Sequence, residues 1–311
     1  MKVRHVLSLA DLGPGNLSRI VNRALEISKR GATVPRTLQG KIVGIYFRGP
    51  STRTRTAFSA AAFKLGAQVI NYAHSDLQLS TGESFSDTAR VLSEYLDVLV
   101  VRTNGPLEEM KALGGQSRMA VINALSEKEH PTQAIADLAA IREALGRLEG
   151  VHILYIGEGN STAAALALAV SQVPEMRLTV VTPESYGLPE GFIGDVCNLA
   201  RQSGGRIEQH HGINNLPRSV DVVYTSRWKV MGVPKHDPNW RHKFEPYQVT
   251  QALLSSVSMP SGTIFLHDLP AIRGEEVVDE VLDGPQSRAF RQSWHKMTGA
   301  MALLEWAVTG E

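Results

Sequence analysis

The stretch KIVGIYFRGPSTRTRTAF, residues 41–58, joins a strand to a helix through a short turn. Residues 41–47 form an apolar run of the kind that makes a buried strand. The pair Gly49-Pro50 marks the turn, and apolar side chains then recur at helical spacing through Leu65. A strand, a turn and a helix in this order form the basic unit of an α/β fold.

The same turn carries Ser51, Thr52, Arg53 and Thr54 where the helix begins. A helix N-terminus presents free backbone N–H groups and the positive end of the helix dipole, and both favour an anion. The hydroxyls add donors, and the arginine can bind phosphate oxygens in a fork. The turn therefore predicts a site for a doubly charged oxyanion. The alternative is an ordinary N-cap followed by solvated arginines.

Further apolar runs alternate with helical patterns along the whole chain. Strands are expected at 41–47, 68–73, 97–103 and 120–124, and after Gly150 at 151–157, 178–185, 221–226 and 263–268. This alternation predicts an α/β fold with two domains, each a parallel sheet flanked by helices, joined by interdomain helices.

Composition restricts the class of protein. The chain has 311 residues, 43% of them hydrophobic, a formal net charge of +1 and a single cysteine, Cys197. Two domains can each bury a core at this length. The near-neutral charge gives no footprint for nucleic acid, and no apolar run is long enough to span a membrane. The lone cysteine fits a reducing compartment, so a cytoplasmic protein is expected.

A second motif, HPTQ at residues 130–133, precedes a strong helical pattern. Proline fits the first helical turn, and residues three apart there share a face, so His130 and Gln133 can point at one ligand. A neutral histidine can polarise a carbonyl and an amide can bind an NH2 group. Taken alone, this histidine is an ordinary turn residue as readily as a catalyst.

The motifs STRTR and HPTQ, in that order, resemble those of the aspartate/ornithine carbamoyltransferase family. Further segments in family order extend the resemblance over almost the whole chain, among them residues 76–103 and GEGNS at 157–161. Four later segments resemble the ornithine branch in particular: VMG at 230–232, RGEEV at 273–277, DEV at 279–281 and DGPQS at 283–287.

The resemblance implies the fold, the reaction and the partners. Residues 1–145, completed by the C-terminal helix at about 288–311, would bind carbamoyl phosphate, and residues 146–287 would bind the acceptor. The enzyme would move the carbamoyl group of carbamoyl phosphate to the amine of an amino-acid-like acceptor and release phosphate. It would need no metal and no organic cofactor. Gln78 matches a position that extends into a neighbouring subunit's site, so a homotrimer is expected.

The resemblance also implies the site residues on the donor side. Arg53, Arg102 and His130 would be catalytic. The carbamoyl phosphate-binding set would be Ser51, Thr52, Arg53, Thr54, Gln78, Arg102, His130, Gln133 and Lys296, with Lys296 in place of the family's late arginine.

The acceptor side departs from the family pattern. The acceptor-binding set implied by position is Ser161, Ser226, Arg227, Met231, Asp268 and Leu269. Ornithine enzymes have Asn at the position of Ser161, Asp at that of Ser226, and Cys at that of Asp268. The carboxylate of Asp268 is expected to orient the acceptor's ammonium or to take its proton. The acceptor is therefore ornithine-type or a non-standard amine.

Residues near the acceptor side allow two interpretations. Trp228, Trp240 and Trp294 either shape an acceptor pocket or are ordinary core residues. Lys229, Lys235 and Arg241 are either part of that region or solvated loop charges. The polar stretch 232–248 has the size of many lids and binding loops.

Two other functions remain open at this point. The run 151–162 places a glycine turn between a strand and a helix, as in NAD-dependent dehydrogenases, but Thr162 stands where the dinucleotide motif requires a third glycine. A non-catalytic relative that binds carbamoyl phosphate without turnover is the other alternative, because the acceptor motifs are altered.

Overall fold

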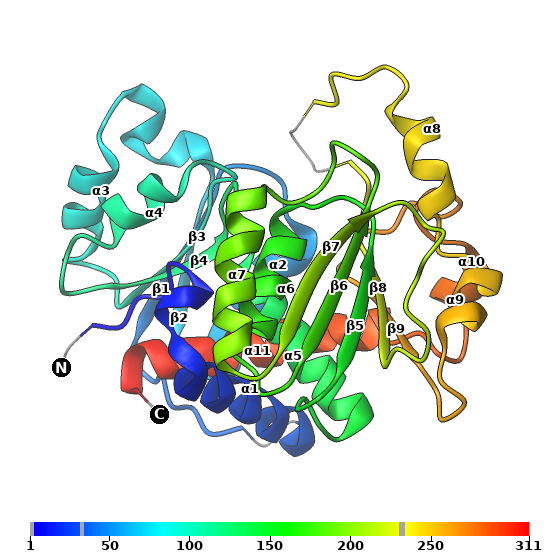
Figure 1. Cartoon of the computed structure of the whole chain (residues 1–311). Coiled ribbons are helices and arrows are strands. Elements are labelled where there is room, and N and C mark those ends of the chain that lie inside the picture. The colour runs from blue at the N-terminus through cyan, green and yellow to red at the C-terminus, as the bar shows by residue number, and fades with distance from the viewer. Residues whose placement is uncertain (1–2, 32–33, 230–233, 311) are drawn as a thin grey trace. The chain divides into compact units, whose positions relative to one another are not determined.

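The computed structural model describes residues 3–31, 34–229 and 234–310 (Figure 1). The chain divides into two compact units. The first comprises Met1–Ala139 with Trp294–Glu311, and the second comprises Ala140–Ser293. Two helices, α5 (Pro131–Leu145) and α11 (Ala289–Thr309), contribute residues to both units.

The described residues of the first unit form a four-stranded parallel sheet in the order β2-β1-β3-β4. The strands are β1 (Ile42–Phe47), β2 (Gln68–Tyr72), β3 (Val98–Arg102) and β4 (Ala120–Leu125). The helical elements are η1 (Leu9–Asp11), α1 (Gly13–Arg30), α2 (Thr52–Lys64), η2 (His74–Asp76), η3 (Gln78–Thr81), α3 (Phe85–Leu92), α4 (Leu107–Leu113) and parts of α5 and α11.

The second unit contains a five-stranded parallel sheet in the order β7-β6-β5-β8-β9, again among the described residues. Its strands are β5 (His152–Ile156), β6 (Arg177–Thr182), β7 (Arg206–His211), β8 (Val222–Thr225) and β9 (Ile264–His267). Its helical elements are α6 (Ser161–Val170), α7 (Glu190–Gln202), α8 (Trp240–Phe244), η4 (Glu245–Tyr247), α9 (Gln251–Val257) and α10 (Asp279–Leu282). The predicted α/β class with two parallel sheets is confirmed.

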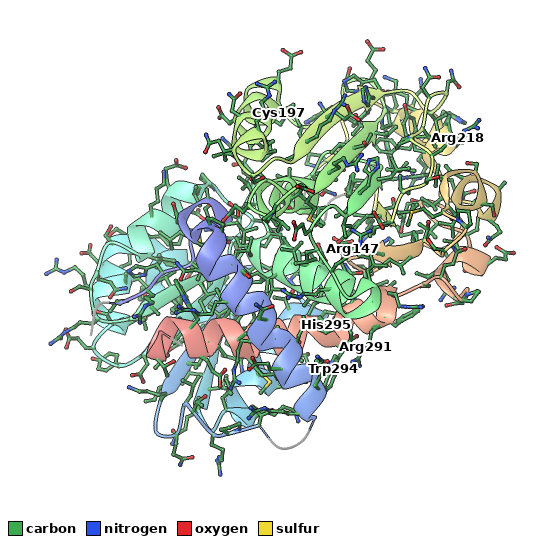
Figure 2. All side chains as sticks on the ribbon, turned by 60° about the horizontal axis from the view of Figure 1, so that its bottom comes forward. Arg147, Cys197, Arg218, Arg291, Trp294 and His295 are labelled. Atoms are coloured by element: carbon green, nitrogen blue, oxygen red, sulfur yellow. The ribbon has the colours of Figure 1, made fainter. Side chains whose placement is uncertain are left out.

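Helix α11 makes contacts within both units, and Figure 2 labels two of its residues that do so, Arg291 and Trp294. Near its start, the Arg291 guanidinium binds the Glu143 carboxylate of α5 through two hydrogen bonds of 2.7 Å, inside the second unit. Three residues later, Trp294 Nε1 donates to Ser28 Oγ of α1 at 2.9 Å, inside the first unit. Trp294 therefore belongs to the first unit, where it is half-buried and hydrogen-bonded to α1.

Each sheet has a point where the strand order reverses, between β1 and β3 in one unit and between β5 and β8 in the other. Successive crossovers leave such a point in opposite directions, which opens a crevice at the carboxyl ends of the strands where ligands bind. The residues that follow these four strands are therefore the first candidates for a site. None of the helices in the described part of the chain is long and apolar enough to cross a membrane.

Candidate active site

The first reversal point is occupied by the turn that opens α2. Ser51 is the N-cap residue, with extended backbone angles, and its side chain makes no capping hydrogen bond. Its Oγ instead accepts a hydrogen bond of 3.2 Å from Nη1 of Arg102, the last residue of the neighbouring strand β3. The Nε atom of Arg102 donates to Asn104 Oδ1 at 3.3 Å. The guanidinium is thus held at the mouth of α2.

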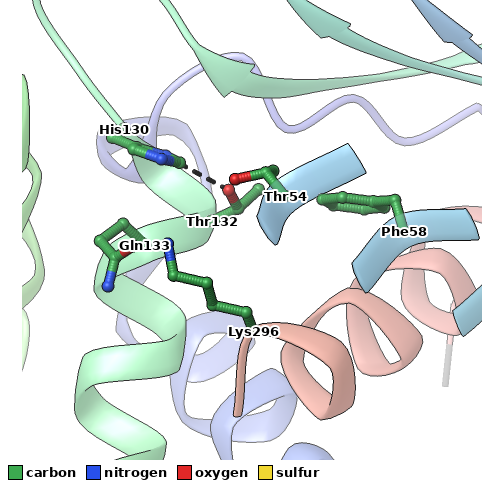
Figure 3. Close-up of a pocket in the computed structure, with 6 residues that line it drawn as sticks. All are labelled: Thr54, Phe58, His130, Thr132, Gln133 and Lys296. Atoms are coloured by element: carbon green, nitrogen blue, oxygen red, sulfur yellow. Dashed lines mark hydrogen bonds between the residues drawn. The ribbon is translucent and has the colours of Figure 1, made fainter. Parts of the chain in front are cut away.

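A small polar cavity lies beside this turn (Figure 3). It is lined by Thr54 and Phe58 from α2, by His130, Thr132 and Gln133 at the start of α5, and by Lys296 from α11. In Figure 3 the Lys296 side chain extends from its helix toward Gln133. Long-range packing therefore brings an ammonium group, from far along the chain, to the cavity formed by the two sequence motifs.

The Gln133 amide has one paired end and one unpaired end. Its Nε2 donates to Asp137 Oδ1 at 2.6 Å, one helical turn along α5, and the Asp137 side chain is fully buried. Its Oε1 is buried and has no hydrogen-bond partner among the residues that the structure describes. A buried acceptor without a donor is costly, so this oxygen is suited to a ligand that brings an N–H group.

His130 is buried and uncharged. Burial, together with the positive charges of Lys296 and Arg102, lowers the pKa of its imidazole well below the ordinary value of 6.5. Its Nδ1 lies 3.3 Å from Thr132 Oγ1. A neutral imidazole fixed on one side suits hydrogen bonding to a carbonyl oxygen.

Glu129, the residue before His130, links the segment before α5 to the N-terminal segment by a hydrogen bond. Its Oε1 accepts a hydrogen bond of 2.7 Å from the backbone N–H of Leu9. Burial raises the pKa of the Glu129 carboxyl to about 7, although the hydrogen bonds from Leu9 and Ser8 oppose that rise. Glu129 was not singled out in the sequence, because nothing local signals a contact across 120 residues.

The other predicted donor-side residues are not among those that line the cavity. Arg53 is half-buried in the first turn of α2, and Thr52 is exposed there. Gln78 is exposed on η3, and its Oε1 accepts a hydrogen bond of 2.6 Å from Thr81 Oγ1. Gln78 is absent from the cavity lining, whereas Phe58 and Thr132 line it without having been predicted as site residues.

In the second unit, Ser226 follows β8 and is the centre of a buried hydrogen-bond chain. Asn160 Nδ2 donates to Ser226 Oγ at 2.9 Å, and the Tyr155 hydroxyl lies 2.6 Å from the same atom. Because the Tyr155 proton is directed to the carbonyl oxygen of Glu158 at 2.8 Å, Ser226 donates to Tyr155. The Ser226 proton is used inside this network, and only a lone pair remains for a ligand.

Asp268 and Leu269 follow β9. Thr162 Oγ1 donates to Asp268 Oδ2 at 2.9 Å, and Leu269 has a positive φ of 54°. The backbone N–H of Leu269 donates to His267 Nδ1 at 2.8 Å, so the His267 proton lies on Nε2 and is donated to Glu276 Oε1 at 3.0 Å. Both His267 and Glu276 are fully buried. This series of hydrogen bonds holds the loop that carries Asp268.

The other acceptor-side predictions lie near these residues or cannot be placed. Ser161 is the first residue of α6. Arg227 directly follows Ser226 and is half-buried, and its Nε has no hydrogen-bond partner among the described residues. Met231 lies outside the residues that the structure describes.

The glycine turn after β5 is shaped by packing. A Cβ atom on Gly159 would lie 2.3 Å from the backbone nitrogen of Leu188, so only glycine fits there. The Asn160 side chain caps α6 by accepting from the N–H groups of Thr162 and Ala163. In a dinucleotide fold such N–H groups face the pyrophosphate, whereas here the chain's own side chain occupies them.

Lys235 is buried, so its interpretation as a solvated loop charge is wrong. Its side chain is only 6% exposed and forms an ion pair with Glu158. The buried rings of Trp228, Trp240 and Phe244 form a cluster beside it, which makes both tryptophans core residues of this region.

Two α/β units, each with polar side chains at the carboxyl ends of parallel strands, place the chain in the two-domain α/β class. Residues 4–143 match the family model described as aspartate/ornithine carbamoyltransferase, carbamoyl-P binding domain, and residues 149–307 match the Asp/Orn binding domain. The chain therefore belongs to the aspartate/ornithine carbamoyltransferase family of transferases. This membership replaces the dehydrogenase interpretation.

Among its relatives, the ornithine carbamoyltransferase of Anoxybacillus flavithermus is 36% identical over 306 residues, covering 98% of this chain and 96% of the relative. That of Gloeobacter violaceus is 38% identical over 301 residues, covering 96% and 94%. The solved structure of ornithine carbamoyltransferase from Pyrococcus furiosus matches with a TM-score of 0.91 at 34% identity, covering 99% of this chain and 98% of that one. The lean toward the ornithine branch is confirmed.

No group of three or more His, Cys, Asp or Glu side chains suited to hold a metal ion occurs within the described ranges. The side chains at the carboxyl ends of the strands in both sheets offer hydrogen-bond donors and acceptors and charged groups. Such groups fit chemistry by placement and electrostatic stabilisation.

Proposed function

We propose that this enzyme is an N-carbamoyltransferase that uses carbamoyl phosphate as donor and an amine of an amino-acid-like molecule as acceptor. The amine nitrogen attacks the carbonyl carbon, the bond from that carbon to the bridging oxygen breaks, and phosphate leaves. The nitrogen loses a proton as the new N–C bond forms. The acceptor is ornithine-type or a non-standard amine, because three acceptor positions differ from the ornithine pattern.

The observation that carries this proposal is the unpaired Oε1 of Gln133. A carbamoyl group has one carbonyl oxygen and one NH2 group side by side. The NH2 group can donate to Gln133 Oε1, whose orientation is set by Asp137. The carbonyl oxygen can accept from the neutral His130 ring through Nε2, since Nδ1 is next to Thr132. We assign the catalytic roles to His130, Arg102 and Arg53.

The phosphate end is assigned to the first turn of α2. Its free N–H groups, the hydroxyls of Ser51, Thr52 and Thr54, and the guanidinium of Arg53 can all donate to phosphate oxygens. Lys296 reaches the same cavity as a point charge. This concentration of positive charge stabilises both the bound dianion and the negative charge that develops on the carbonyl oxygen.

The acceptor side is assigned to the carboxyl ends of β5, β8 and β9. The set is Ser161, Ser226, Arg227, Met231, Asp268 and Leu269. Asp268, about one-fifth exposed, can pair with the acceptor's ammonium or take its proton. Arg227 can bind an acceptor carboxylate through its unpaired Nε.

The test is phosphate release from carbamoyl phosphate across a panel of amines, with the wild-type enzyme and Arg53→Ala side by side. Acceptor-dependent release that the variant lacks would support the proposal and identify the acceptor class. Binding of carbamoyl phosphate, measured by calorimetry, with no release for any amine would instead favour the non-catalytic alternative.

A homotrimer and a cytoplasmic location stay predictions. Gln78 is exposed on η3 and does not line the cavity of its own unit. Its side chain can therefore reach the site of a neighbouring subunit. Sedimentation equilibrium would measure the subunit number. A Gln78→Ala enzyme that remains a trimer but binds carbamoyl phosphate less tightly would support the shared site.

A further inference from the structure

The ammonium group of Lys235 lies inside an aromatic cage. Its Nζ is 4.7 Å from the ring centre of Tyr186, 5.1 Å from that of Phe244 and 5.7 Å from that of Trp240. All three distances are within the range at which a cation is attracted to the face of an aromatic ring. The Glu158 carboxylate pairs with the same ammonium group.

The rings pack on one another, and the ammonium group between them is largely shielded from water. The centroid distances are 4.9 Å between Tyr186 and Phe244 and 5.9 Å between Trp240 and Phe244. Side-chain exposure is 6% for Lys235 and 17% for Glu158. Burial raises the pKa of the Glu158 carboxyl, and the lysine partner opposes this rise. Aromatic rings around a cation are the arrangement that recognises quaternary ammonium ligands.

The cage also adjoins the edge assigned to the acceptor. Glu158 belongs to the turn after β5, two residues before Asn160, and its backbone carbonyl oxygen accepts the Tyr155 proton. Trp228, which packs against Phe244, follows Arg227 in the sequence. The lysine thereby connects the segment bearing α8 to the turn after β5.

We propose that these rings and Glu158 form a binding site for an alkylammonium group, that Lys235 fills it from within the chain, and that this filling shapes the acceptor-binding edge. The consequence for the acceptor rests on the proposed function. In the residues that directly follow β5, β8 and β9 (157–160, 226–229 and 268–271), the carboxylates are Glu158 and Asp268. Because Glu158 is neutralised by Lys235, Asp268 is the carboxylate left for the acceptor's amine.

The experiment removes the Lys235 ammonium group by mutation and adds an external cation in solution. Tetramethylammonium is the probe, since it binds aromatic cages and has no N–H to be carbamoylated. In Lys235→Ala we expect saturable binding on the order of millimolar by calorimetry, and a melting temperature that rises with the salt. Wild type and Lys235→Met, whose cages are filled, should show neither effect. Lys243→Ala, which removes an exposed charge from α8, is the matched control and should also show neither effect.

A kinetic arm tests the link to the acceptor. Lys235→Ala should raise the acceptor KM about tenfold, tetramethylammonium should partly restore it, and the dissociation constant for carbamoyl phosphate should stay unchanged. The cage proposal would be overturned if Lys235→Ala folds and binds no cation. It would also be overturned if Lys235→Ala stays unfolded at every concentration of the salt. An unchanged acceptor KM would overturn its link to the acceptor. If cation binding appears while wild type transfers no carbamoyl group to any amine, the proposed function fails and the cage stands.

Discussion

Gln133 and Asp137 are joined across one turn of α5, where the glutamine Nε2 donates to the buried aspartate Oδ1 at 2.6 Å. An aspartate at this position accepts only from the NH2 end of the amide. The glutamine oxygen is therefore directed away from it, without a partner among the described residues. One carboxylate thus decides which end of the amide meets the ligand.

Gln133→Leu should weaken carbamoyl phosphate binding about tenfold, because the ligand NH2 group loses its acceptor. Asp137→Asn should have a smaller effect, since the asparagine oxygen can still accept from the glutamine. Calorimetry with carbamoyl phosphate measures both. Equal binding by wild type and Gln133→Leu would contradict the assigned role of Gln133.

Asp268→Ala should raise the acceptor KM far more than the dissociation constant for carbamoyl phosphate. The acceptor's ammonium would lose its carboxylate partner, and the phosphate would lose nothing. Thr162→Val removes the hydroxyl that holds Asp268 Oδ2 and should give a weaker change in the same direction. Steady-state kinetics with each substrate varied in turn provides the comparison. Equal losses for both substrates would show that Asp268 supports the fold instead.

Ser226→Ala should lower the free energy of unfolding by about 1–3 kcal/mol, because the Asn160 Nδ2 group loses its acceptor and the buried Tyr155 oxygen loses its donor. Thermal denaturation followed by circular dichroism measures the loss. Tyr155→Phe in the Ser226→Ala background should not recover the loss, because it also removes the hydrogen bond from the Tyr155 hydroxyl to the Glu158 carbonyl oxygen. If the single variant melts like wild type, the network contributes little to stability.

Glu129→Gln should stabilise the protein at pH 8 and have little effect at pH 5. The pKa of Glu129 is about 7 in the folded state against an ordinary value of 4.5, so the folded state binds more protons between these values. Stability from this group is present at low pH and is lost as the pH rises from 4.5 through about 7, by about 3 kcal/mol at most. Glutamine keeps an oxygen for the Leu9 N–H and carries no charge.

Melting temperatures at several pH values test this prediction. The difference between Glu129→Gln and wild type should grow as the pH rises. Glu108→Gln, a change at an exposed position on α4, serves as the control and should not show such a trend. A constant difference at all pH values would mean that Glu129 is already charged in the folded protein at pH 5.

The strands and the turn that opens α2 could be predicted because their signals are local. The apolar run 41–47 corresponds to β1 (Ile42–Phe47), and the run 263–268 to β9 (Ile264–His267). Strand β7 was missed because it lies at a sheet edge, and of its residues only Ile207 is buried. Its polar sequence carries no apolar pattern.

The sequence by itself determined the two α/β units, the helix N-terminus that bears Ser51 to Thr54, and the start of α5 at the HPTQ motif, since backbone propensity and periodicity act within a few residues. Only the tertiary structure decided which partner each polar atom has. It brought Lys296 to His130 and buried Lys235 among aromatic rings. The reason is physical: a side chain's hydrogen bonds and charge environment depend on what packs against it, and those groups come from distant parts of the chain.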